Sequence, residues 1–264
     1  MGWEYLYILA LVAAVLSAVG FYKFVYFLSI GYGFAVAGIG AALLILFGGK
    51  VQAVHIAQCV LFILYGARLS GFLLYREVKN TAYRKTLAEA TTSEKAMPVF
   101  VKAAIWISVS ILYVAQTSPV FYRLYNGAAD AALPWVGAAI SLLALVVETV
   151  ADLQKSAEKA KNPNMVATKG LYRIVRCPNY FGEILFWTGV LIGGLTALTG
   201  WGQWLMAVLA YAAIVYIMFD GAKRLEKRQL ARYGSNPAYA AYAEKTPIIL
   251  PLAPLYHLNK EAGK

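Results

Sequence analysis

The chain has 264 residues, of which 61% are hydrophobic and only 14% are charged. A soluble domain carries about a quarter charged residues, so this composition excludes soluble globular and disordered proteins and indicates a chain dissolved in lipid. The net charge of +11 comes mostly from basic residues that flank apolar segments, which is typical of a membrane protein and argues against a nucleic-acid partner.

Seven apolar stretches are long enough, or nearly long enough, to cross a bilayer at about 20 residues each. Hydrocarbon offers no partner to a backbone amide, so these stretches are expected to be helices. We therefore predict an all-α, polytopic membrane protein with seven transmembrane helices in a single membrane domain, residues 1–264. The stretches cover about 4–21, 25–48, 52–75, 99–118, 134–154, 182–198 and 202–221.

The second stretch contains Gly31, Gly33, Gly38 and Gly40, a spacing that superficially matches a dinucleotide-binding loop. Such a loop needs a strand before it and a helix after it, whereas these glycines lie within an apolar segment. Close packing of two membrane helices explains them better.

The positions of the basic residues predict the orientation. If the C-terminus is cytoplasmic, all of the 24 lysines and arginines except Lys50, Arg68 and Arg123 fall in cytoplasmic segments. Cytoplasmic loops carry an excess of Lys and Arg, so the N-terminus is expected outside and the C-terminus inside.

Charged side chains form a stripe on the fifth stretch. Glu148, Asp152, Lys155 and Lys159 follow the spacing i, i+4, i+7 and i+11, which places them on one face of a helix. For Lys155 and Lys159, ion pairing along the helix is as good an explanation as a bound ligand. Glu148 lies too deep in the apolar stretch for that, because a membrane-embedded acid needs a partner or a task. A polar ligand that reaches down the stripe is the sharper interpretation.

A basic loop follows, and Pro178 predicts that a new helix begins near Asn179. The free backbone donors at that start, together with Arg173 and Arg176, suit an anion such as phosphate. Topogenic charges and a capping Asn179 are the alternative. A third basic segment, KRLEKRQLARYG, starts at Lys223 and suits either a polyanionic ligand or lipid headgroups. Cys59 and Cys177 show no metal or redox spacing, so we expect free thiols and no metal site.

Several of these segments resemble the steroid 5α-reductase family. The run GLYRIVRCPNYFGEILFW, preceded by ETVADLQKSAEK and followed by RLEKRQ and YAAYAEKTPIILP, carries the resemblance over roughly residues 140–252. The resemblance implies a seven-helix membrane oxidoreductase that uses NADPH to reduce the carbon–carbon double bond of a 3-oxo-Δ4 steroid or similar lipophilic enone. Residues 1–118 would then form the substrate side and residues 134–264 the NADPH side.

Individual cofactor residues follow from the resemblance. Asp152 falls at a family Asp, and Asn179 and Glu183 match residues beside the nicotinamide. Glu148 stands where the steroid enzymes have Asn, and Lys159 replaces a phosphate-binding Arg, which loses the bidentate fork. The tail residues Arg224, Glu226 and Arg228 fall where the family binds the diphosphate and adenosine. The full predicted NADPH-binding set is Glu148, Asp152, Lys155, Lys159, Lys169, Arg173, Arg176, Asn179, Tyr180, Glu183, Arg224 and Arg228.

On the substrate side, LYGARLSGFLLYRE resembles the family's third-helix segment and puts Tyr65 at the tyrosine that acts on the substrate carbonyl. An ordinary core tyrosine is the alternative, since the chain has 19. The glutamate that assists this tyrosine in the animal enzymes has no equivalent between Glu4 and Glu77. Ser29, Tyr32 or His55 could take the place of this glutamate, or the reaction could rely on Tyr65 alone. These three residues and Arg68, to which the resemblance gives a structural or cofactor role, complete the predicted substrate-binding set.

Two rival functions stay open at this point. Membrane methyltransferases of the isoprenylcysteine or phospholipid type, which use S-adenosylmethionine, share a related basic–Pro–aromatic–Gly loop. A non-enzymatic transporter or channel would use the basic segments as lipid anchors. In every case the bilayer is the expected environment, with no nucleic acid and no obligate protein partner. A bacterial inner membrane, or the endoplasmic reticulum of a eukaryote, is the expected location.

Overall fold

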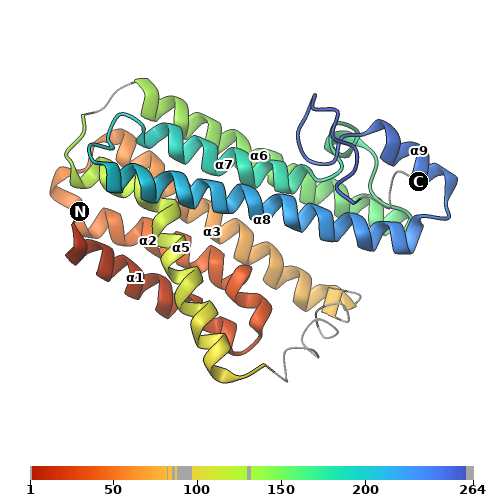
Figure 1. Cartoon of the computed structure of the whole chain (residues 1–264), viewed down its shortest axis with the longest axis horizontal. Helices are drawn as coiled ribbons and strands as arrows, with labels where there is room; N and C mark the ends of the chain where they lie inside the picture. Colours follow the sequence, from red (N-terminus) through yellow and green to blue (C-terminus); the bar gives the residue numbers. More distant parts are fainter. Residues whose placement is uncertain (1, 82, 85–86, 88–96, 130–131, 260–264) are drawn as a thin grey trace. The chain divides into compact units, whose positions relative to one another are not determined.

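The computed structural model describes residues 2–81, 83–84, 87, 97–129 and 132–259 (Figure 1). These residues form helices and connecting loops, with no strand among them. They divide into two compact units, which are described separately. Unit 1 comprises Met1–Ala138 and Val190–Ala210, and unit 2 comprises Ala139–Gly189 and Tyr211–Lys264.

Six helical segments among the described residues are long and apolar enough to cross a membrane, which supports an integral multi-pass protein. The predicted count of seven is not reproduced. The segment expected at 182–198 is α7 (Pro178–Gly194), which has only 17 residues. At 1.5 Å per residue it is about 25 Å long, shorter than the ~30 Å hydrocarbon core. The six segments are Trp3–Phe21, Phe24–Leu46, Ala53–Lys79, Val99–Tyr125, Ala132–Lys161 and Trp201–Tyr233.

Unit 1 is a bundle in which α2 and α3 pack most extensively against each other. Its helices are α1 (Trp3–Ser17), η1 (Ala18–Phe21), η2 (Phe24–Leu28), α2 (Ile30–Leu46), η3 (Gly48–Lys50), α3 (Ala53–Lys79) and α5 (Val99–Tyr125). The structure confirms that glycines bring α2 close to its neighbours. A Cβ on Gly66 would lie 2.0 Å from the Gly33 carbonyl oxygen, and one on Gly40 would lie 2.8 Å from the Cys59 oxygen. The two backbones approach too closely for any larger residue.

Arg123, near the end of α5, is fully buried in unit 1. Its Nε donates to Gly193 O at 2.9 Å, its Nη1 donates to Ala129 O at 2.9 Å, and its Nη2 donates to Thr196 Oγ1. From the sequence, this arginine is placed only among the charges outside the cytoplasmic segments. It instead satisfies backbone carbonyls where α7 ends, which fixes the C-terminal turn of that helix.

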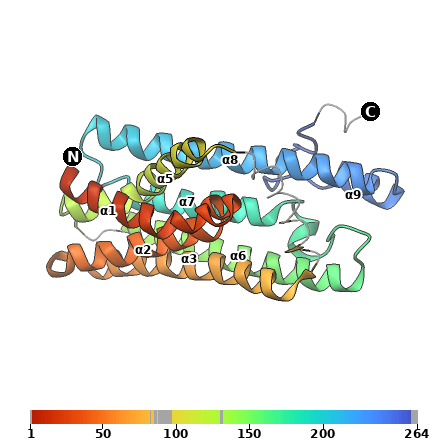
Figure 2. The same cartoon turned by 90° about the horizontal axis from the view of Figure 1, so that it is seen from below.

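Four exposed tryptophans occupy the first turns of three helices within unit 1. They are Trp3 in α1, Trp135 in α6 (Ala132–Lys161), and Trp201 and Trp204 in α8 (Trp201–Tyr233). Both views place these helix starts at the same end of the unit (Figure 1, Figure 2). Tryptophan prefers the bilayer–water interface, so this end of unit 1 carries one side of an aromatic belt.

Unit 2 contains the larger parts of α6, α7 and α8, together with η4 (Gly170–Arg173) and α9 (Pro237–Lys245). Ser141 Oγ on α6 donates to Phe186 O on α7 at 3.0 Å, and the Thr188 and Tyr211 hydroxyls join α7 to α8 at 2.8 Å. The three helices therefore run side by side (Figure 1). The prediction that a helix begins next to Asn179 is confirmed, since α7 starts at Pro178.

Candidate nucleotide-binding site

A basic pocket of about 180 Å³ lies in unit 2. Five cationic side chains and no acidic one line it, together with three tyrosines. Four of the five were predicted as cofactor-binding residues, and they come from three segments far apart in the sequence: α6, the loop before α7, and α8. The charged and aromatic lining residues are Lys155, Lys159, Arg176, Arg228, Arg232, Tyr172, Tyr233 and Tyr242. Such a cluster of donors suits a polyanion.

Arg176 is the most deeply buried of these cations, with 3% of its surface exposed. Its Nη2 donates to Glu226 Oε1 at 2.8 Å and also to Tyr256 O. Its Nε has no hydrogen-bond partner among the described residues. Arg176 thus contributes a buried positive charge to the pocket wall, and part of its hydrogen-bonding capacity is left open.

Glu226 holds the C-terminal segment in place. It is 1% exposed, and besides Arg176 it accepts hydrogen bonds from the Leu258 amide at 2.9 Å, the Asn259 amide at 3.0 Å and Asn259 Nδ2 at 2.8 Å. His257 Nδ1 lies 3.0 Å from its Oε1. The carboxylate thus joins α8, the loop before α7 and the chain end. The sequence placed Glu226 in a cofactor-binding region, whereas the structure gives it this positioning role.

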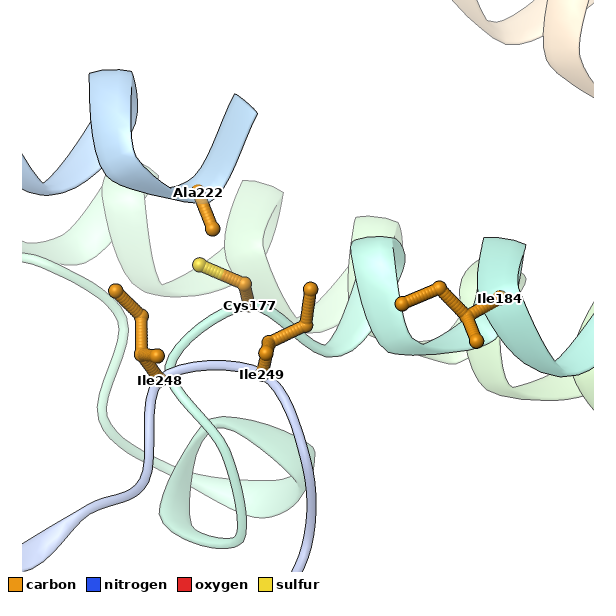
Figure 3. Close-up of a cluster of buried hydrophobic side chains, with 5 residues drawn as sticks. All are labelled: Cys177, Ile184, Ala222, Ile248 and Ile249. Atoms are coloured by element: carbon orange, nitrogen blue, oxygen red, sulfur yellow. The ribbon is translucent and has the colours of Figure 1, made fainter. Parts of the chain in front are cut away.

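The segment after α9 is anchored a second time, through backbone and apolar contacts. The amides of Arg176 and Cys177 donate to Pro247 O at 2.8 Å and Ile248 O at 2.9 Å. Ile248 and Ile249 then pack with Cys177, Ile184 and Ala222 (Figure 3). The loop that carries Arg176 therefore has a fixed conformation beside the pocket.

Lys159 lines the pocket with an ammonium group that already has three partners. Its Nζ donates to Pro163 O at 3.2 Å, Met165 O at 2.6 Å and the Tyr233 hydroxyl at 2.7 Å. An ammonium has three donors, so Lys159 would have to exchange one of these partners to bind a phosphate oxygen directly. It still contributes positive charge to the pocket.

A hydrogen-bonded chain leads from the pocket to the predicted polar residues of α6 and α7. The Tyr172 hydroxyl, at the pocket wall, donates to Asn179 Oδ1 at 2.9 Å, and Asn179 Nδ2 donates to Asp152 Oδ1 at 2.7 Å. Tyr242 donates to Tyr172 O at 2.6 Å, which fixes the first member of the chain. Asp152 and Asn179, predicted from distant segments, are therefore in direct contact.

Two buried acids lie on the same helices. Glu148 is 2% exposed, and a Cβ on Gly182 would lie 2.5 Å from its Cγ, so α7 can pass Glu148 only because residue 182 is glycine. Glu183 is 7% exposed and accepts a hydrogen bond from Trp187 Nε1 at 2.8 Å. The structure thus brings Glu148, Asp152 and Asn179 together on the facing sides of α6 and α7, and it buries Glu183 one turn after Asn179 on α7.

Four other predicted cofactor residues lie outside the pocket lining. Lys169, directly before η4, and Arg173, its last residue, are both exposed. Arg224 is exposed and pairs with Asp220 one helical turn away. Tyr180 packs on the Cys177 cluster.

Tyr242, a pocket residue, lies outside the membrane-spanning helices. Burial raises the pKa of its hydroxyl, which therefore stays a neutral hydrogen-bonding group near pH 7.

The predicted substrate residues lie in unit 1. Tyr65 is fully buried on α3, and the ring of Tyr32 lies between it and Tyr113, with centroids 5.7 Å and 4.8 Å away. His55 accepts a hydrogen bond from the Gln52 amide at 3.0 Å in a capping box at the start of α3. Ser29 Oγ donates to Val25 O at 2.8 Å. Arg68 is half-buried on α3. Of the predicted substrate-side residues, Tyr32 has a ring contact with Tyr65. His55 instead caps the start of α3.

The predicted set lacked four of the charged and aromatic residues that line the pocket: Arg232, Tyr233, Tyr172 and Tyr242. Arg232 and Tyr233 follow Arg228 by four and five positions on α8, so helical spacing alone could have placed Arg232 beside it. Tyr172 carries no sequence signal, because its role depends on how the loop before α7 folds back on α6.

Comparison with known families gives one match. Residues 14–246 match the model of a family described as "Protein of unknown function (DUF1295)". No curated protein and no solved structure matches the chain.

Proposed function

The chain belongs to this family, which is related to steroid 5α-reductase-like membrane proteins. We propose that it is a membrane-embedded, NADPH-dependent reductase. Its substrate in this proposal is a lipophilic enone, such as a 3-oxo-Δ4 steroid, whose carbon–carbon double bond it reduces. The observation that carries the proposal is the basic pocket, from which Tyr172 leads by hydrogen bonds to Asn179 and Asp152.

The charge of the pocket favours a phosphorylated nucleotide. NADPH carries a diphosphate and a 2′-phosphate, which the five cations and the unpartnered Nε of Arg176 complement. S-Adenosylmethionine carries a sulfonium and an ammonium against one carboxylate, so five cations would repel it. This electrostatic difference supports the reductase over the methyltransferase.

The size of the pocket limits what it holds. At about 180 Å³, it is smaller than the ~300–1,000 Å³ typical of whole-ligand pockets. We therefore assign to it phosphate groups of the nucleotide and not the complete molecule. Tyr172 and Asn179 mark the direction in which the rest would extend, toward the acids of α6 and α7.

When bound, NADPH supplies a hydride to the enone. The chain's own task is then to stabilise the negative charge that develops on the carbonyl oxygen and to return a proton to the product. The Tyr65 hydroxyl is suited to that task because it is buried, neutral and flanked by another tyrosine ring. We accordingly expect Tyr65→Phe to lower turnover about 100-fold, with NADPH affinity unchanged. Unchanged turnover would remove Tyr65 from the mechanism.

The decisive experiment measures nucleotide binding to the purified protein in lipid nanodiscs. We expect NADPH to raise the unfolding temperature and S-adenosylmethionine to leave it unchanged. Enone-dependent oxidation of NADPH then tests the reaction itself.

Arg228→Gln and its neighbour Lys227→Gln form a matched pair for that experiment. Both residues are exposed cations on α8, but only Arg228 lines the pocket. We expect Arg228→Gln to weaken NADPH binding about 10-fold, as for the loss of one charge-assisted contact, and Lys227→Gln to have little effect. Equal effects of the two variants, or binding of S-adenosylmethionine in place of NADPH, would overturn the proposal.

A further inference from the structure

Two glutamines are buried inside unit 1 without the hydrogen bonds that their amides require. Gln58 on α3 and Gln116 on α5 are each 4% exposed. Neither the oxygen nor the nitrogen of either amide has a partner among the described residues. Buried amides in proteins are almost always hydrogen-bonded, to protein groups, a ligand or ordered water.

Both glutamines lie on helices that meet the last turn of α7. A Cβ on Gly193 would lie 2.3 Å from Gln58 Nε2, and a Cβ on Gly194 would lie 2.3 Å from Pro119 Cβ. Gln116 is one turn before Pro119 on α5. The two amides therefore belong to one region of unit 1, beside the two glycines that end α7.

The same faces of the two helices lead from the amides to the tyrosines. Gln58 and Tyr65 are seven residues apart, which is two turns and about 10 Å along α3. On α5, Tyr113 precedes Gln116 by one turn. Tyr32 contacts the rings of both Tyr65 and Tyr113, so the tyrosines form one layer and the amides lie to one side of it.

We infer that Gln58 and Gln116 bind oxygen functions of the substrate remote from the enone, a hydroxyl or a carbonyl that lies about 5 Å (Gln116) to about 10 Å (Gln58) along the helices from the tyrosine layer. A primary amide both donates and accepts hydrogen bonds, so it can recognise either group. The ligand is then an elongated, rigid lipid that carries oxygen at both ends. This inference rests on the proposed function, because it takes Tyr65 as the residue that contacts the enone oxygen. The burial of the two amides and their lack of partners do not depend on that role.

The test uses two enones that are identical except at the end remote from the double bond, one with a hydroxyl there and one with hydrogen. We expect the wild-type protein to favour the hydroxylated enone at least ~10-fold in kcat/KM, because the analogue leaves buried amides unpaired. In Gln58→Leu and Gln116→Leu the ratio should approach one. Lipid-facing controls, Ile56→Leu and Ile111→Leu, should keep the wild-type ratio.

A binding measurement separates this inference from the reductase proposal. The saturated hydroxylated and deoxy compounds, which cannot be reduced, are added to the protein without NADPH, and the unfolding temperature is measured. A larger shift with the hydroxylated compound, lost in Gln58→Leu, supports the amide site even if no enone is reduced. Enone reduction with no preference for the remote hydroxyl overturns the amide site alone. If a leucine variant does not fold, Gln58→Met, closer in shape, replaces it in both measurements.

Discussion

The two units bury polar side chains in different ways. Among its described residues, unit 1 buries neutral amides and hydroxyls, and the fully buried cation there, Arg123, is satisfied by backbone carbonyls and a threonine. Unit 2 buries formal charges, among them the ion pair of Arg176 and Glu226. Neutral donors and acceptors suit a ligand that arrives through lipid, whereas concentrated charge suits a ligand that arrives from water. Under the proposed function, this is the difference expected between a site for a lipophilic substrate and a site for a water-soluble nucleotide.

The largest effect should come from the buried ion pair of unit 2. Glu226→Leu leaves the Arg176 guanidinium buried without its carboxylate and releases the chain end, so we expect a loss of about 3–5 kcal/mol in the free energy of unfolding. The matched control is Asp220→Leu on the same helix. Asp220 and Arg224 have side chains 37% and 64% exposed, and such pairs contribute at most about 1 kcal/mol. Chemical unfolding in detergent measures both; equal losses would contradict the difference in burial.

The Cys177 thiol tests how rigid unit 2 is beside the pocket. Burial raises the pKa of this thiol to about 12. Its contribution to the free energy of unfolding is therefore complete at a pH below the ordinary thiol pKa, and it is lost as the pH rises toward 12. In a Cys59→Ala background, we expect iodoacetamide at pH 8 to alkylate native Cys177 roughly 100-fold more slowly than the unfolded chain. Similar rates in the folded and unfolded protein would show that the chain-end segment is not held closed.

Close helix packing in unit 1 provides a third test. Gly66→Ala forces a methyl group to 2.0 Å from Gly33 O, and we expect it to lower the free energy of unfolding by about 2 kcal/mol. Gly71→Ala, on the same helix, meets nothing within 4 Å and should stabilise the helix by up to about 1 kcal/mol. Opposite signs in a thermal unfolding series confirm the close approach; a neutral Gly66→Ala contradicts it.

The smallest effect should come from cations that lie outside the pocket lining. Lys169→Gln removes an exposed charge on the same unit, and we expect the Kd for NADPH to change less than about twofold at 0.15 M salt, because ions screen charges at this range. Isothermal titration beside Arg228→Gln measures the contrast. A Lys169→Gln effect as large as that of Arg228→Gln would move the binding site toward η4.

Sequence reasoning succeeded where one helix carries the information. The stripe on α6, the start of α7 at Pro178 and the glycine contacts of α2 all follow from local spacing. It failed where distant segments supply the partners. The partners of Arg123 lie 6 to 73 residues away in the sequence. Those of Glu226 lie 31 to 50 residues away, from His257 to Arg176. No local pattern predicts such contacts. The bounds of α7 were predicted about four residues too late, at 182–198, because hydropathy continues past Gly194, where the helix ends.

The tryptophans at the start of α8 have a consequence for the depth of the basic pocket. With 33 residues, α8 is about 50 Å long, whereas the hydrocarbon core measures ~30 Å. If Trp201 and Trp204 anchor one end at the headgroups, roughly 20 Å of the same rod must emerge on the opposite side. Arg228 and Arg232 lie on that emergent part. Altering acyl-chain length would shift these two arginines relative to the water layer, so under the proposed function bilayer thickness becomes a means of tuning nucleotide affinity without any mutation.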